Sequence, residues 1–268
     1  MSSQINYSIS KTKLAALQSG LFSIGIVLAL MSAPQAMSAP VRVVLEESPP
    51  HQVVKDGQIS GLSTAVVDAV LKRAGETASY EVYPWARAYR IALTTPNVLI
   101  YNIARTPERE AQFEWIGKVA NYKFGFLKLT RRSDIQVRQL SDLRQYAVGA
   151  QRDDFMAEWL RDVAKLPAEH LQLQPDVVET WRLLVNGKID LMSDDPHAID
   201  DILKKYQLQR SDIEFVLFPP ELEVPTWLAL KKGSSPDLVR RLRQAYRQVE
   251  GSAVHRKVME LSYEPKPL

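Results

Sequence analysis

Two arginines and two glutamates follow directly on an apolar segment in the stretch IYNIARTPEREAQFEWIG, residues 100–117. The residues NVLIY (97–101) have the composition of a buried strand. A loop at the end of such a strand is anchored by a rigid element, and its side chains can face a cleft. Arginine and glutamate at this position either bind charged groups of a ligand or form a solvated, charged turn. The elements that surround the loop decide between these alternatives.

Carboxylates stand at the ends of several other predicted elements: Glu46, Glu47, Asp153, Asp154, Asp194 and Asp195. Asp153 and Asp154 begin a predicted helix, where a carboxylate caps the free backbone N–H groups and repels an anionic ligand. A cleft built from these ends is expected to be acidic on balance. The alternative for Asp153 is a helix cap that faces solvent.

The apolar spacing along the chain alternates between the strand period and the helix period. Strands are predicted at 41–47, 79–83, 97–101, 146–150, 171–174 and 189–195, and helices at 62–75, 85–93, 153–165, 177–187, 197–206 and 234–250. The extended stretches 122–130 and 213–218, with 227–233, join the two halves. This order predicts an α/β fold of two lobes, each a mainly parallel sheet flanked by helices, with two crossing strands as the hinge. Ligands of such folds bind between the lobes, at the carboxyl ends of the strands.

The N-terminal 38 residues have the order of a secretory signal peptide: two lysines and no acid, the apolar run LFSIGIVLALM (21–31), then a small-residue stretch. We predict cleavage after Ser38, with a cut after Ala36 or an uncleaved anchor helix as alternatives. The chain contains no cysteine, so it has neither disulfides nor a thiol for a lipid anchor. We therefore expect a freely diffusing, monomeric protein of the periplasm.

The charge gives no support to a nucleic-acid partner. The formal net charge is +3, and removal of two lysines with residues 1–38 lowers it to about +1. About 230 residues remain, which is enough for two lobes with cores of their own.

Short motifs occur in order along residues 41–262: Pro49-Pro50, Pro84-Trp85, Thr106-Pro107-Glu108-Arg109 with Gln112 and Trp115, Leu140-Ser141-Asp142-Leu143 with Ala147-Val148-Gly149, Asn186-Gly187-Lys188-Ile189-Asp190, and Gly233. Each motif is weak alone, but the ordered set resembles solute-binding protein family 3. This family comprises type 2 periplasmic binding proteins, and its best-known members serve polar amino-acid ABC transporters.

The resemblance implies roles for two charged residues. Arg109 falls on the arginine that grips the ligand's α-carboxylate, and its planar, permanently charged fork suits such a group. A surface arginine paired with Glu108 or Glu110 is the alternative. Asp195 falls on the carboxylate that receives the ligand's amino group. We therefore expect a zwitterion or a cation with at least one amino group.

The sequence departs from the family pattern at other ligand-binding positions. Asn102 and Ala104 stand where amino-acid binders carry hydroxyl or backbone donors. Asp153 and Asp154 replace the Gly-Ser/Thr that donates amides to the carboxylate. Ser48 and His51 replace the flanking aromatic residues. Trp85, Tyr89 and Tyr101 are alternative aromatic contacts, or else core residues.

The predicted parts are a signal peptide (1–38), the first part of lobe I (39–128), lobe II (129–223) and the return to lobe I (224–268). The resemblance implies a solute-binding protein, not an enzyme, that delivers a small-molecule ligand to an ABC permease. One alternative is a soluble sensor for a membrane kinase. Another is a periplasmic dehydratase-type enzyme with Glu47 or Asp154 as general acid. No cofactor and no metal are expected; the segment from Asp194 to His197 is the weak candidate for a metal site.

Overall fold

The computed structural model describes residues 39–259. The predicted signal peptide (1–38) and its cleavage after Ser38 lie outside the described residues. Within residues 39–259, no helix combines the length and the apolar content needed to cross a membrane.

Five strands form the first sheet: β1 (Val41–Leu45), β4 (Ala78–Val82), β5 (Val98–Ala104), β6 (Phe113–Lys123) and β12 (Glu223–Lys231). Their order is β4-β1-β5-β12-β6. β1 pairs in parallel with β4 and β5, whereas β12 is antiparallel to both of its neighbours. We refer to this sheet and the helices packed on it as lobe I.

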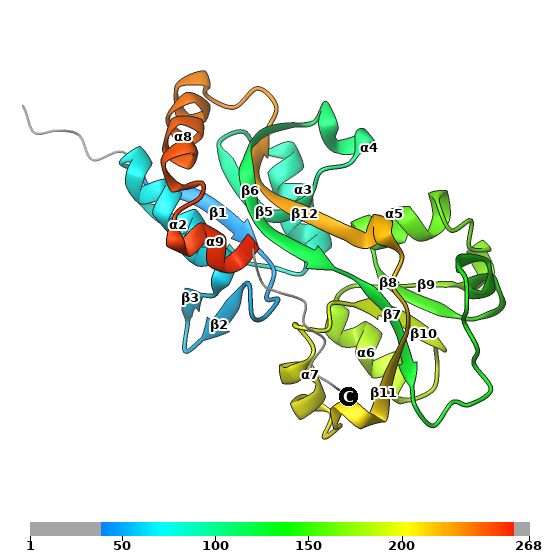
Figure 1. The fold of residues 1–268 in the computed structure, drawn as a ribbon. Helices are drawn as coiled ribbons and strands as arrows, with labels where there is room; N and C mark the ends of the chain where they lie inside the picture. Colours follow the sequence, from blue (N-terminus) through cyan, green and yellow to red (C-terminus); the bar gives the residue numbers. More distant parts are fainter. Residues whose placement is uncertain (1–38, 260–268) are drawn as a thin grey trace, which may run out of the picture. The chain divides into compact units, whose positions relative to one another are not determined.

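Helices cover both faces of the first sheet (Figure 1). They are α2 (Leu62–Ala74), α3 (Trp85–Thr94), α8 (Pro236–Val249) and α9 (Ala253–Met259). Because side chains alternate along a strand, Val43 and Leu45 of β1 pack with α2 and α8, while Val44 packs with α3 on the other face. The predicted helix stop at Gly75 is present: its φ of 73° is in the left-handed region that glycine adopts without strain.

Five more strands form the second sheet: β7 (Gly125–Leu129), β8 (Val148–Gln151), β9 (Leu171–Gln174), β10 (Leu191–Asp194) and β11 (Ile213–Leu217). Their order is β11-β7-β10-β8-β9, with the last three strands parallel. Three α-helices flank this sheet: α5 (Phe155–Asp162), α6 (Val177–Val185) and α7 (Asp200–Lys205). Leu191 packs with α5 and Met192 packs with α6, so this sheet too is buried on both faces. We refer to it and its helices as lobe II.

The remaining elements are short: β2 (Val53–Lys55), β3 (Gln58–Ser60), α4 (Pro107–Glu110) and the 3₁₀ turns at Leu140–Gln145, Ala168–His170, Arg210–Asp212 and Pro220–Leu222. α4 holds the Thr-Pro-Glu-Arg segment directly after β5, with Pro107 in its first turn.

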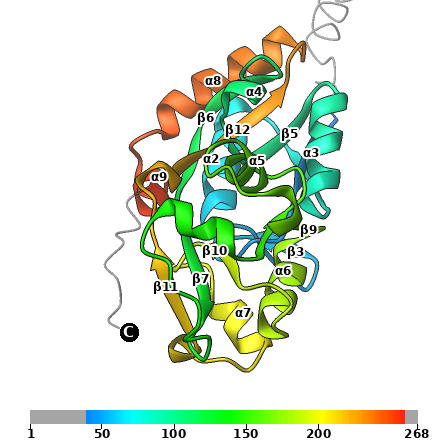
Figure 2. The same cartoon turned by 90° about the vertical axis from the view of Figure 1, so that its right-hand side faces the viewer.

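The chain crosses between the sheets twice. β6 leaves the first sheet at Lys123 and β7 enters the second at Gly125, so only Phe124 separates them. The return runs from β11 into β12, which lies beside β6 over most of its length (Figure 1 and Figure 2). The predicted boundary after residue 128 thus lies inside β7, and the one after residue 223 lies at the first residue of β12. The predicted α/β fold with two sheets and two crossings is confirmed.

Candidate functional site

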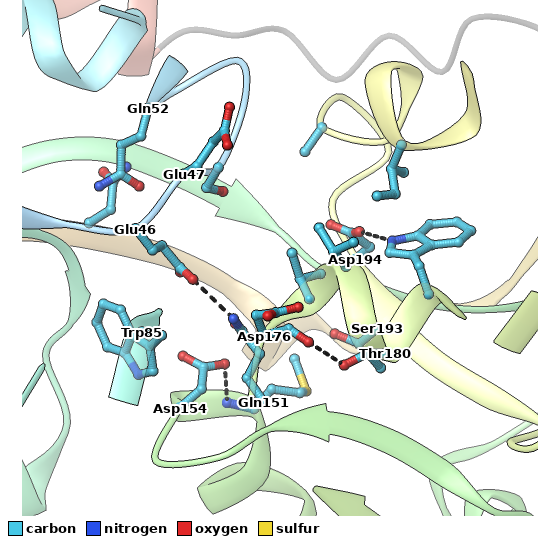
Figure 3. Close-up of a pocket in the computed structure, with 18 of the residues that line it drawn as sticks. Glu46, Glu47, Gln52, Trp85, Gln151, Asp154, Asp176, Thr180, Ser193 and Asp194 are labelled. Atoms are coloured by element: carbon cyan, nitrogen blue, oxygen red, sulfur yellow. Dashed lines mark hydrogen bonds between the residues drawn. The ribbon is translucent and has the colours of Figure 1, made fainter. Parts of the chain in front are cut away.

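A cavity of about 530 Å³ lies between the strand ends of the two lobes (Figure 3). Its charged lining consists of Glu46, Glu47, Asp154, Asp176, Asp194, Asp201 and Lys205. Its aromatic lining consists of Tyr83, Trp85, Tyr122, Phe124, Phe155 and Trp181. Both lobes contribute to each set, so a ligand in this cavity contacts both lobes at once. The excess of acids agrees with the acidic cleft that the sequence predicts.

Glu46 follows the last residue of β1 and is half-buried in the cavity wall. Its Oε2 accepts a hydrogen bond of 3.0 Å from Nε2 of Gln151, which belongs to lobe II (Figure 3). Burial, together with the negative charges of Asp154, Asp176 and Asp194, raises the pKa of Glu46 to about 8, although the hydrogen bond from Gln151 opposes the shift. Several carboxylates therefore share this small volume, and a cation near Glu46 would restore its ionised form.

Asp194 is the last residue of β10 and lines the opposite part of the cavity (Figure 3). Its Oδ2 accepts a hydrogen bond of 2.7 Å from Nε1 of Trp181, and its Oδ1 accepts one of 2.7 Å from the amide of Asp195. Burial raises the pKa of Asp194 to about 7. Because both hydrogen-bond donors, an indole and a backbone amide, are uncharged, they fix the direction of the carboxylate but do not supply a positive charge.

Two further carboxylates cap the helices that begin at the cavity. Asp154 precedes α5, and its Oδ2 accepts from the amide of Met156 at 3.1 Å. Asp176 precedes α6, and its Oδ1 accepts from the amide of Glu179 at 2.8 Å. A free helix N-terminus is a natural anion site. Here a protein carboxylate already occupies each of the two.

Arg109 does not line the cavity, although the sequence analysis placed it on a ligand carboxylate. Only 1% of its surface is exposed. Its Nη2 donates to Oε1 of Glu158 at 2.9 Å and to the carbonyl of Asp153 at 3.2 Å, both in lobe II. Its guanidinium also lies 4.9 Å from the ring centre of Tyr89. Arg109 is held away from the cavity because Glu158, one helical turn after Asp154 on α5, directs its carboxylate toward the guanidinium.

Asp195 also lies outside the cavity lining and is 2% exposed. Its Oδ2 accepts from the amide of Lys123 at 3.0 Å, and its Oδ1 accepts from the amide of His197 at 2.9 Å. It therefore joins the end of β10 to the last residue of β6, at the crossing between the lobes. Along a strand that alternates sides, Asp194 faces the cavity and its neighbour faces this joint.

Of the other predicted site residues, some line the cavity and some lie outside it. Asn102, Ala104, Trp85, Glu47 and Asp154 line the cavity. Tyr101 is fully buried in the core of lobe I, and its hydroxyl lies 2.9 Å from Oγ1 of Thr64. The backbone carbonyl oxygen of Asp153 accepts hydrogen bonds from Nε1 of Trp85 at 2.9 Å and from Nη2 of Arg109. The φ of Asp153 is 59°, a left-handed conformation that Asp tolerates.

Several lining residues were not predicted from the sequence: Gln52, Gln151, Asp176, Thr180, Trp181 and Ser193. Glu46 and Asp194 were predicted as acids of the cleft, without a role in binding the ligand. Asp176 had a usable signal, because it caps a helix directly after a parallel strand, as Asp154 does. Asn102 Nδ2 and Ser193 Oγ are buried in the wall without a hydrogen-bond partner among the described residues. Such groups cost stability until a partner satisfies them. In residues 39–259, no group of three or more His, Cys, Asp or Glu side chains is arranged to hold a metal ion.

The architecture is that of the two-lobed type 2 periplasmic binding proteins. A histidine kinase sensor domain with similarity to periplasmic binding proteins is 18% identical, with a TM-score of 0.69 over 84% of this chain and 98% of that one. The substrate-binding protein of an amino acid ABC transporter is 16% identical, with a TM-score of 0.67 over 82% and 96%.

The arginine-, lysine-, histidine-binding protein ArtJ from Geobacillus stearothermophilus is 19% identical, with a TM-score of 0.68 over 85% and 97%. No protein-family model and no curated protein matches the sequence. At these identities the similarity establishes the fold, and the function has to be argued from the cavity.

Proposed function

We propose that the protein binds a small amino-bearing solute in the cavity between its lobes and delivers it to an ABC permease. The observation that carries this proposal is the distribution of the acids. Glu46 belongs to lobe I, whereas Asp176 and Asp194 belong to lobe II. An ammonium group between them is attracted by both lobes, so its binding favours the closed arrangement.

The proposal describes a binding protein of the periplasm, monomeric and without a lipid anchor, rather than an enzyme. The lobes are proposed as 39–128 with 224–268, and 129–223. The two crossings at β6–β7 and β11–β12 serve as the hinge. The solved structure of the substrate-binding protein of an amino acid ABC transporter, which has this fold, supports the transport role.

A thermal-shift screen of the purified protein tests the binding function. The compounds are amino acids, diamines and polyamines, opines and small carboxylates. A compound that binds only the folded state at a hundred times its Kd adds about 2.7 kcal/mol of stability. A screen in which no amine stabilises the protein contradicts the proposal. Loss of the shift in the double variant Glu46→Gln, Asp194→Asn would place the binding in the cavity.

A sensor role is the second candidate, favoured by the similarity to the histidine kinase sensor domain. Uptake of the radiolabelled solute separates the two roles in the native cell. If the protein serves transport, deletion of its gene abolishes uptake of the solute. A sensor's deletion leaves uptake intact at first and removes the transcriptional response to the solute.

A further inference from the structure

Three groups near the cavity that are suited to hold a ligand carboxylate are each already paired with a carboxylate of the protein. Arg109 is bound to Glu158 at 2.9 Å. The N-terminus of α5 is capped by Asp154, and the N-terminus of α6 is capped by Asp176. An anionic ligand would have to displace one of these internal carboxylates, and the displaced charge would stay close by.

The charges that face the cavity reinforce this argument. Among the described residues that line it, six are acids and one is a lysine, Lys205, whose side chain is exposed on α7. Within residues 39–259, none of Glu46, Asp154, Asp176 and Asp194 forms an ion pair with an arginine or lysine. Arg109 acts on Asp154 only at longer range, so none of the four carboxylates has a directly paired cation among the described residues, and a cationic ligand supplies one.

The arrangement of the acids indicates more than one positive charge. In Figure 3, Glu46 and Asp154 lie on one side of the site and Asp194 lies on the other. Aromatic rings in the lining, among them Trp85 and Phe124, offer apolar surface for a hydrocarbon chain. A ligand with a cationic group at each end and an aliphatic middle therefore matches the lining.

We propose that the cavity binds an organic dication that lacks a carboxylate, such as a linear diamine or a guanidinoamine. One cationic end lies between Glu46 and Asp154, and the other lies at Asp194. This inference rests on the proposed function, because it names the class of solute for the same cavity. In this arrangement Arg109 joins the lobes through Glu158 and does not contact the ligand.

Matched pairs of compounds test the inference by isothermal titration calorimetry on the purified protein. Cadaverine differs from lysine, putrescine from ornithine, and agmatine from arginine by the absence of the carboxylate. The decarboxylated member of each pair is expected to bind about a hundredfold tighter, because the carboxylate meets several acids and a single lysine, which is exposed on α7. Amino acids that bind as tightly as their decarboxylated partners, or more tightly, overturn the inference and leave the proposed function standing. If none of the six compounds binds, the inference fails, and the wider thermal-shift screen of amines decides the proposed function.

Substitutions of single acids test which carboxylates hold the cationic groups of the ligand. Glu46→Gln and Asp194→Asn are each expected to weaken cadaverine binding at least about tenfold. Glu221→Gln and Asp56→Asn make the same changes at exposed positions outside the cavity, and are expected to leave the affinity unchanged. Equal affinities in the cavity variants and these controls overturn the inference.

Arg109 gives an independent readout. If it does not contact the ligand, Arg109→Lys is expected to leave the ratio of lysine affinity to cadaverine affinity unchanged. Glu158→Gln is a second variant of the same contact, for use if the substitution of Arg109 prevents folding. A selective loss of lysine binding in Arg109→Lys shows that the guanidinium holds a ligand carboxylate and contradicts the inference.

Discussion

Ionisation of Glu46 is expected to destabilise the unliganded protein, and the substitution Glu46→Gln removes this effect. The pKa of Glu46 is raised from an ordinary value of 4.5 to about 8, first by burial and then by the neighbouring carboxylates. At about 1.4 kcal/mol for each pKa unit, this corresponds to about 5 kcal/mol of unfolding free energy at high pH. Water entry and side-chain movement on ionisation reduce the cost, so we expect about 2 to 5 kcal/mol.

The sign follows from proton binding. The folded protein holds the Glu46 proton up to about pH 8, whereas the unfolded chain releases it near pH 4.5. The unfolding free energy therefore falls as the pH rises through this window. The amide of Glu46→Gln is neutral at every pH and can still accept the hydrogen bond from Gln151. The variant is expected to match the wild type within about 1 kcal/mol at pH 5 and to exceed it by about 2 to 5 kcal/mol at pH 9.

Urea unfolding at pH 5, 7 and 9 measures the effect, and Glu221→Gln is the matched control at an exposed position. Asp194, with a pKa raised to about 7, remains in both proteins and does not contribute to the difference. The same variant is expected to bind diamines more weakly, so stability and binding change in opposite directions. If Glu46→Gln and the wild type show parallel pH dependence, Glu46 is not held in its neutral form by burial, and the electrostatic reasoning for the cavity is refuted.

Three further predictions concern other parts of the molecule. Arg109→Met and Glu158→Gln are each expected to lower the unfolding free energy by about 1 to 3 kcal/mol, since each leaves a half-buried or buried partner unpaired; a double-mutant cycle with no coupling energy would show that the pair does not form. Binding of the solute is expected to reduce the radius of gyration in small-angle scattering, because the lobes close at the two crossings; an unchanged radius would indicate a rigid cleft. Mass spectrometry of the exported protein is expected to find an N-terminus near Ala39, whereas intact residues 1–38 in a membrane fraction would contradict cleavage.

The local elements could be predicted because their signals are local. The near-continuous apolar run of Val41–Leu45 predicts a buried strand, and β1 packs against helices on both faces of its sheet. Gly75 ends α2 in the left-handed conformation, and the Ser235 side chain caps α8. The stretch 122–130 was predicted as one extended segment, but it divides at Phe124 between two sheets. The choice of sheet on each side of Phe124 depends on pairing with strands far away in the chain, which the local sequence does not specify.

The arginines of α8 show the same limit of prediction from the sequence. From the sequence alone, the arginines of α8 fit either a solvated charged surface or a stripe that binds a partner. In the structure Arg241 pairs with Glu76 at 2.5 Å and Arg243 pairs with Glu114 at 2.9 Å. Both partners lie more than a hundred residues earlier in the chain, so no sequence window could bring them together.

The sequence by itself determined the α/β order of elements and the presence of carboxylates at the strand ends, because strand and helix periods and helix caps depend on neighbours a few residues away. Only the tertiary structure decided which of these charges face the cavity. Asp194 faces it and Asp195 does not, since the two are adjacent at the end of one strand and point to opposite sides. Arg109 pairs with Glu158 because α4 and α5 meet across the lobes, although 49 residues separate them in the chain. The electrostatic character of the site is thus a property of the folded arrangement, in which pairing across the lobes engages Arg109 and leaves an excess of acids in the cavity lining.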